Sequence, residues 1–168
     1  VRSVCIGVPG PWSSALPFTT QCSVQTVPYY SGFNNDLEIS CWNQLNLNND
    51  PHIFNFGNSA NSEPVAKLRT SGLSLITNDM LITPQFVFDG VTQKQIRFKY
   101  QAYGSFNGTT ITGESSYAMK VSTTGAGAAN FTTEIAPLQT FFTGFNWVER
   151  VVVIPQSVVG NVNIAWHL

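Results

Sequence analysis

Alternation of apolar and polar residues with a period of two is the feature that most constrains how this chain can fold. Ile96, Phe98 and Tyr100 alternate with charged or amide residues, so they would face one side of an extended segment. The same pattern recurs in three further segments, at residues 117–121, 147–154 and 162–166. Short strands repeated in this way indicate an all-β fold, a β-sandwich or jelly roll, whose core lies between two sheets.

The alternation also predicts which side chains enter the core. Met119 and Val121 would face inward, whereas Lys120 and Ser122 would face the solvent. The best helix candidate, Ser62 to Leu68, contains Pro64, so we expect any helix to be short. Turn signals separate the predicted strands at Asp89-Gly90, Asn107-Gly108, residues 125–127 and Gly160-Asn161.

The surface composition excludes several function classes. Only 10% of the residues are charged, against roughly 25% in an average globular protein, and the formal net charge is −1. A chain without a basic stripe lacks the main source of nucleic-acid affinity, so we expect no nucleic-acid partner. No apolar run reaches about 18 residues, so we expect no membrane insertion, and an export signal would lie upstream of Val1.

The chain divides into two unequal parts. Residues 1–22 indicate two strands around a Pro/Gly turn, too few to bury a core alone, and a linker of small residues follows. We therefore predict the end of one domain at 1–22 and most of another domain at 23–168. Each part would lack strands, which a longer polypeptide or neighbouring chains would supply.

Particular segments resemble known families. The stretch VRSVCIGVPGPWSSALPFTTQC resembles the last strands of a fibronectin type III repeat of secreted Bacteroidetes proteins. The segments VPYYSGFNNDLEISCW, NDMLITPQFVFDG, QIRFKYQAYG, SYAMKVSTTG and WVERVVVIPQSVVGNVNIAWHL are similar in order and spacing to the cleaved-adhesin, or choice-of-anchor J, domain, a relative of the MAM domain. This resemblance implies a jelly-roll β-sandwich, lacking its last strand, preceded by a partial fibronectin type III β-hairpin.

The resemblance also implies a function. Such domains are noncatalytic adhesion or carbohydrate- and protein-binding modules of larger secreted or cell-surface bacterial proteins, with surface glycans, proteins and neighbouring domains as partners. The alternative is a structural subunit of an extracellular filament or shell, assembled by strand exchange between chains. Calcium is the one cofactor implied, because the family often places a carboxylate after the residue that matches Phe33. Here that position is Asn34, whose neutral amide would weaken the site.

The best local candidate for a ligand surface lies in the Asn-rich stretch after Trp42. Phe54, Asn55, Phe56 and Asn58 combine aromatic faces with amide side chains, as sugar-binding sites do. In the alternative interpretation, Phe54 and Phe56 form the inward side of a short strand and Asn55 points outward. A second aromatic cluster at residues 141–147 would either bind a ligand or close one end of the sandwich.

The titratable residues do not match a known catalytic motif, so we expect no enzyme activity. Asp36 and Glu38 would lie on one face of an extended segment, as a glycosidase pair could, although such carboxylates are more often solvated. His52 is expected in a loop and His167 on the polar side of the last strand, both with structural or solvated roles.

Three cysteines, at positions 5, 22 and 41, lack the spacing of a metal cluster. We predict a Cys22–Cys41 disulfide, because Cys22 ends the upstream strand and Cys41 begins the resembled domain, which leaves Cys5 as the odd thiol. In that domain, we expect the indole rings at positions 42, 147 and 166 to lie in or near the core, whereas Trp12 belongs to the partial repeat.

Overall fold

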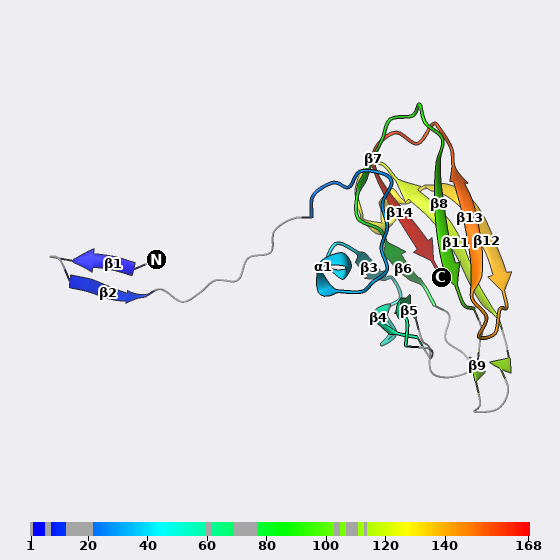
Figure 1. Ribbon diagram of the computed structural model, residues 1–168, viewed down its shortest axis with the longest axis horizontal. Helices are drawn as coiled ribbons and strands as arrows, with labels where there is room; N and C mark the ends of the chain where they lie inside the picture. Colours follow the sequence, from blue (N-terminus) through cyan, green and yellow to red (C-terminus); the bar gives the residue numbers. More distant parts are fainter. Residues whose placement is uncertain are drawn as a thin grey trace.

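Strands make up most of the structure, a computed structural model that describes residues 2–5, 8–12, 22–59, 62–68, 77–102, 105–106, 111–112 and 114–168 (Figure 1). The strands are β1 (Arg2–Cys5), β2 (Val8–Trp12), β3 (Asn43–Asn46), β4 (Asn55–Asn58), β5 (Pro64–Lys67), β6 (Asp79–Ile82), β7 (Phe86–Phe88), β8 (Lys94–Tyr100), β9 (Ser105–Phe106), β10 (Ile111–Thr112), β11 (Ser115–Ser122), β12 (Thr133–Phe141), β13 (Val148–Ile154) and β14 (Gly160–His167). One helix, α1 (Asp36–Ile39), and one 3-10 turn, η1 (Ala128–Asn130), complete the described elements. The predicted all-β class is confirmed.

The larger layer is an antiparallel sheet with the order β12-β11-β14-β6-β3, in which β7 also pairs with β14. The first part of β14 pairs with β7 and the last part with β6. Between them Pro84 lacks an N–H for the ladder, and Thr83 continues the pairing with Ile164 through its backbone N–H (2.9 Å) and its hydroxyl (3.0 Å). Gly160 and Asn161, predicted as a turn, are instead the first residues of β14.

The second layer is the antiparallel pair β8–β13, which lies across the larger sheet (Figure 1). Burial along β8 alternates with a period of two, as predicted from Ile96, Phe98 and Tyr100. The main core lies between the layers, where Met119 and Val121 of β11 meet the inward residues of β13. Its buried members are Phe86, Phe88, Tyr117, Met119, Val121, Ala136, Val152, Ile154, Val158, Val162 and Ile164.

A loop covers part of the outer face of the larger sheet, the face turned away from β8 and β13. Phe131 in this loop packs on Met80, Ile82 and Ala165 and forms a second, smaller core. Ser122, predicted to be solvent-exposed, is therefore buried. Its hydroxyl donates to the carbonyl of Gly125 (2.6 Å) and accepts from the N–H of Thr124 (3.2 Å), which anchors the loop to the end of β11.

The predicted helix candidate from Ser62 to Leu68 is wrong. Residues Pro64–Lys67 form strand β5, which pairs with β4, and proline is tolerated there because it is the first strand residue. The helix that forms is α1, at Asp36–Ile39. Its N-cap is Asn35, whose side chain accepts a hydrogen bond from the N–H of Glu38 at 3.0 Å.

Residues near the N-terminus form the antiparallel hairpin β1–β2, as the strand pattern predicted. Its assignment to a fibronectin type III repeat, and the division of the chain at residue 22, stay predictions. The side chains of Cys5 and Trp12 lie outside the described part of the chain.

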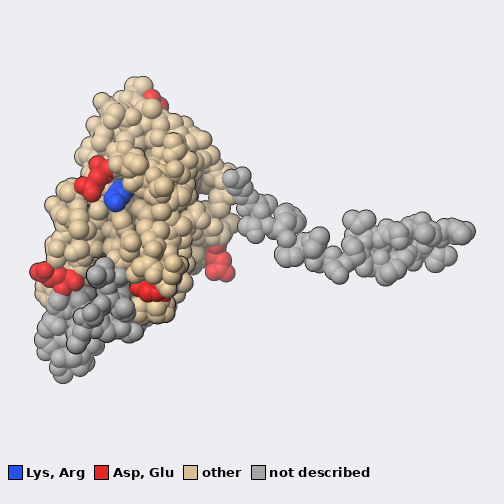
Figure 2. Space-filling view, turned by 180° about the vertical axis from the view of Figure 1, so that it is seen from behind, with Lys and Arg blue, Asp and Glu red and all other residues tan. Residues whose placement is uncertain are grey.

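Charged side chains are sparse over the face of the molecule that Figure 2 shows. A few acidic groups are scattered over its edges, one basic area lies among them, and uncharged residues cover most of the rest. On this face, the described residues form no basic stripe of the kind that would attract a phosphate backbone.

Candidate functional site

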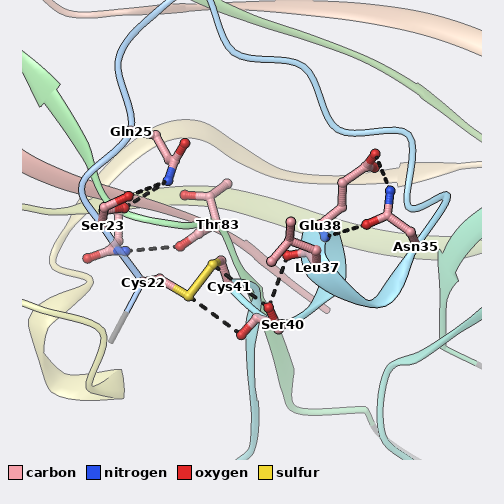
Figure 3. The surroundings of a disulfide bond; sticks show 10 residues. Cys22, Ser23, Gln25, Asn35, Leu37, Glu38, Ser40, Cys41 and Thr83 are labelled. Carbon is pink, nitrogen blue, oxygen red and sulfur yellow. Dashed lines mark hydrogen bonds between the residues drawn. A yellow bond between two sulfur atoms is a disulfide. The ribbon is translucent and has the colours of Figure 1, made fainter. Parts of the chain in front are cut away.

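The Cys22–Cys41 disulfide ties the segment before the sandwich to the chain two residues after the end of α1 (Figure 3). The two Cα atoms are 5.6 Å apart, so the predicted pairing is confirmed. Three residues after Cys22, Gln25 bonds to the larger sheet, where its N–H donates to the carbonyl of Gln85 at 2.7 Å. The disulfide and this bond together fix the entry of the chain into the sandwich.

The candidate carboxylate pair, Asp36 and Glu38, does not lie on one extended face, because both residues belong to α1. Glu38 instead completes a capping box with Asn35, since its Oε1 accepts from the Asn35 amide Nδ2 at 3.1 Å. The paired-carboxylate arrangement is therefore wrong for these residues. Glu38 supports the start of the helix and the turn before it.

The turn around Asn34 is built on the carboxylate of Glu38. Oε2 of Glu38 accepts from the backbone N–H groups of Gly32 (3.0 Å) and Asn34 (3.2 Å), so hydrogen-bond donors surround the nearby carboxylate. A calcium ion needs oxygen ligands there. No group of three or more His, Cys, Asp or Glu side chains with metal-site geometry occurs among the described residues. Calcium at Asn34 stays a prediction, which these contacts do not favour.

An aromatic chain runs from the β4–β5 hairpin into the sandwich. Its members in order are Phe56, Phe33, Trp42, Trp166 and Phe98. The successive ring centroids lie 5.5, 4.9, 6.0 and 5.2 Å apart. Trp42 and Trp166 are therefore near-core, as predicted, and link the start of β3 to both layers of the sandwich.

The predicted ligand residues separate into two groups. Phe54 is only 6% exposed and Phe56 is half-buried in the aromatic chain, whereas Asn55 and Asn58 are exposed. The ring of Phe54 thus offers no surface to a ligand, in agreement with the alternative interpretation. Lys67 on β5 donates from Nζ to the backbone carbonyl of Asn58 at 2.9 Å and adds a positive charge to the hairpin. Ligand binding by this hairpin stays a prediction.

The second aromatic cluster, at residues 141–147, is partly built into one end of the sandwich. Phe141 stacks on Tyr117 with ring centroids 4.6 Å apart, and the Arg150 guanidinium lies 5.0 Å from the Phe141 ring centroid. Burial raises the pKa of Tyr117, an effect that the Arg150 charge partly offsets. Phe142 remains 54% exposed, and Trp147 is half-buried.

His167 lies on the polar outer face of β14, as predicted, in a shallow pocket of about 360 Å³. Its Nδ1 is 3.0 Å from the Lys120 ammonium, which can only donate, so Nδ1 accepts. Nε2–H then donates to Oδ1 of Asn78 at 2.8 Å. This arrangement fixes the neutral ring. Burial, and then the charge of Lys120, lowers the pKa of His167. Lys120 and Asn78 are distant in sequence, so the pattern did not reveal them as its partners.

These contacts predict that stability falls in mild acid. Because the pKa of His167 is lower in the folded chain than the ordinary value of 6.5, the stabilisation is present above about pH 6.5 and is lost as pH falls through the lower folded value. His167→Gln should therefore reduce the loss of melting temperature between pH 7.5 and pH 5. A thermal melt series on both proteins measures this, and identical pH profiles would contradict it.

Comparisons with known proteins place the fold. Neither protein-family models nor curated proteins match the chain. Among solved structures, the K1 cleaved adhesin domain of Lys-gingipain from Porphyromonas gingivalis W83 superposes with a TM-score of 0.58 at 20% identity, over 77% of this chain and 81% of that domain. The chain has the fold of a cleaved adhesin domain.

The K3 cleaved adhesin domain of the same gingipain is a second match, with a TM-score of 0.46 and 13% identity, over 77% of this chain and 83% of that domain. The cleaved-adhesin fold inferred from the sequence is thus confirmed by the K1 comparison. In the part of the chain that is described, no helix has the length and apolarity needed to cross a membrane.

Proposed function

We propose that this chain is a noncatalytic adhesion module of a larger secreted or cell-surface bacterial protein. The observation that carries the proposal is the shared fold with the K1 cleaved adhesin domain over most of both chains. A surface with few charges and many amide and hydroxyl groups supports it, because such groups bind neutral partners through hydrogen bonds.

The β4–β5 hairpin is the contact surface that we propose. Asn55 and Asn58 are both exposed. Asn58 lies on the same face of β4 as the partly exposed ring of Phe56, whereas Asn55 lies on the other face, where its Nδ2 donates to the carbonyl of Ile53 at 2.9 Å. Amides beside an aromatic edge can bind the hydroxyls and apolar face of a sugar, or the backbone of a protein partner. We therefore propose a surface glycan or a surface protein as ligand.

An array of glycans and surface proteins, probed with the labelled full chain, tests the adhesion function. We expect saturable binding to at least one class of neutral glycan or protein, with weak salt dependence because few charges take part. Binding that disappears at moderate salt would contradict a neutral contact surface. An array without any saturable signal would contradict the function itself.

The second candidate function is that of a structural subunit, and the open edges of the β8–β13 strand pair support it. Within the described part of the chain these two strands pair with each other alone, and Val151 and Val153 on the outer side of β13 are 42% and 54% exposed. An open strand edge with apolar neighbours can accept a strand from another chain. Size-exclusion chromatography with light scattering decides: assembly above a monomer supports this candidate, and a monodisperse monomer at high concentration excludes it.

A further inference from the structure

The shallow pocket beside His167 lies on the outer face of the larger sheet, and the proposed hairpin contact does not use it. Its lining comes from β11, β12 and β14 and from the segment before β6. Ala118, which pairs with His167 across β11 and β14, has a small and buried side chain and so leaves room for the pocket. The volume of about 360 Å³ is within the range of small-molecule sites.

Lys120 gives this pocket a positive charge that no ion pair neutralises. Its ammonium group donates to Nδ1 of His167 at 3.0 Å, which leaves two of its three N–H donors for another acceptor. The ion pairs formed by the described residues do not include Lys120, although its side chain is half-buried. An acidic group bound here would therefore gain a charge-assisted hydrogen bond.

Two uncharged side chains add hydrogen-bonding groups on the same side of the pocket. Oδ1 of Asn78 accepts from the His167 ring at 2.8 Å, whereas Nδ2 of Asn78 carries two N–H donors that none of the described residues accepts. The hydroxyl of Thr77 can donate or accept. Because His167 uses both of its ring nitrogens on Lys120 and Asn78, this side offers mainly donors and suits a ligand with oxygen acceptors.

The β12 side of the pocket differs, because it combines an acidic group with apolar surface. Glu134 lies directly opposite Lys120 in the pairing of β11 with β12, yet its carboxylate is exposed and forms no ion pair with Lys120. A free carboxylate at this position can accept from a hydroxyl group. Leu138, which is 65% exposed, and Leu168 supply surface for C–H groups.

We propose that this pocket binds a small hydroxylated carboxylate, the chemistry of a uronic-acid sugar. The ligand carboxylate would accept from Nζ of Lys120 and from Nδ2 of Asn78, and its hydroxyls would bond to Thr77 and Glu134. The His167 ring, held between Lys120 and Asn78, would position both donors without touching the ligand charge. The site adds a charged contact to the neutral one of the β4–β5 hairpin.

Titration of the nitrogen-15-labelled full chain with glucuronate, glucose or acetate at constant ionic strength tests the site by NMR. We expect saturable shifts of the Asn78, Lys120 and His167 amide signals with glucuronate. Glucose lacks the carboxylate and should bind at least about tenfold more weakly, and acetate lacks the hydroxyls and should also bind more weakly. Absence of saturable shifts with glucuronate, or equal affinity for glucuronate and either of the other two compounds, would overturn the proposal.

Variants separate this site from a general effect of charge. Lys120→Gln should weaken glucuronate binding at least about tenfold, whereas Lys99→Gln, an exposed change on β8, should keep the parent Kd. Glu134→Gln removes a repelling charge and should tighten binding about twofold or more, which tests the site even where Lys120→Gln fails to fold. Equal effects of the two lysine changes, or weaker binding by Glu134→Gln, would contradict the assignment.

The double variant Asn55→Ala, Asn58→Ala distinguishes this pocket from the hairpin. It should bind glucuronate with the parent Kd, because the two amides lie outside the residues that line the pocket. A loss of glucuronate binding in this variant would place the carboxylate contact at the hairpin and overturn the pocket assignment.

Discussion

Replacing Trp166 by alanine is expected to lower the free energy of unfolding by about 3 kcal/mol, the lower end of the range for truncating a large aromatic residue, because the ring keeps some exposure. The indole contacts Trp42 on one side and Phe98 on the other, and thereby joins β14 to both β8 and the start of β3. Denaturant unfolding followed by circular dichroism measures the loss.

Phe142→Ala is the matched control for this variant. It removes a ring of similar kind that is 54% exposed, so the cost should stay below about 1 kcal/mol. Equal losses in the two variants would show that the aromatic chain does not join the layers in the way the structure indicates.

Loss of the Cys22–Cys41 disulfide is expected to destabilise the chain by a similar amount. The bond closes a loop with a sequence separation of 19 residues, which corresponds to about 3 kcal/mol in the chain-entropy model. The double variant Cys22→Ser, Cys41→Ser should therefore unfold at markedly lower denaturant concentration than the parent chain.

Cys5→Ser is the control for the disulfide, and it should leave the unfolding midpoint unchanged. Alkylation of the folded chain without reductant should label Cys5 and leave the other two cysteines unmodified. Labelling of both Cys22 and Cys41 under these conditions would rule the bond out.

The period-two pattern was sufficient to predict strands that have one face packed on the core. Burial alternates along β8 as the sequence indicated, because one face of that strand packs on the main core. In β11 and β14 the residues predicted to point inward lie in that core, but residues on the opposite face, such as Ala118 and Ala165, are buried as well. Ser122 was misassigned because a loop from the same chain covers the outer face at that point, and no local pattern reveals a cover of that kind. The Ser62–Leu68 segment was misassigned because pairing with β4 determines its structure.

The candidate sites were harder to predict than the strands. The burial of Asp79 depends on Leu168 and β3, which are distant in the sequence, so it could not be inferred from a single sequence. Phe54 was a candidate ligand residue because its ring is aromatic. In the structure that ring is buried, so it offers no surface to a ligand.

The central claim is that this chain binds a surface partner through the β4–β5 hairpin. Its most direct test is biolayer interferometry with the ligand found on the array, comparing the parent chain with the double variant Asn55→Ala, Asn58→Ala. Asn161→Ala, an exposed change on β14, is the control. We predict at least a tenfold weaker Kd for the hairpin variant and an unchanged Kd for the control. Equal affinity of all three proteins would contradict the claim.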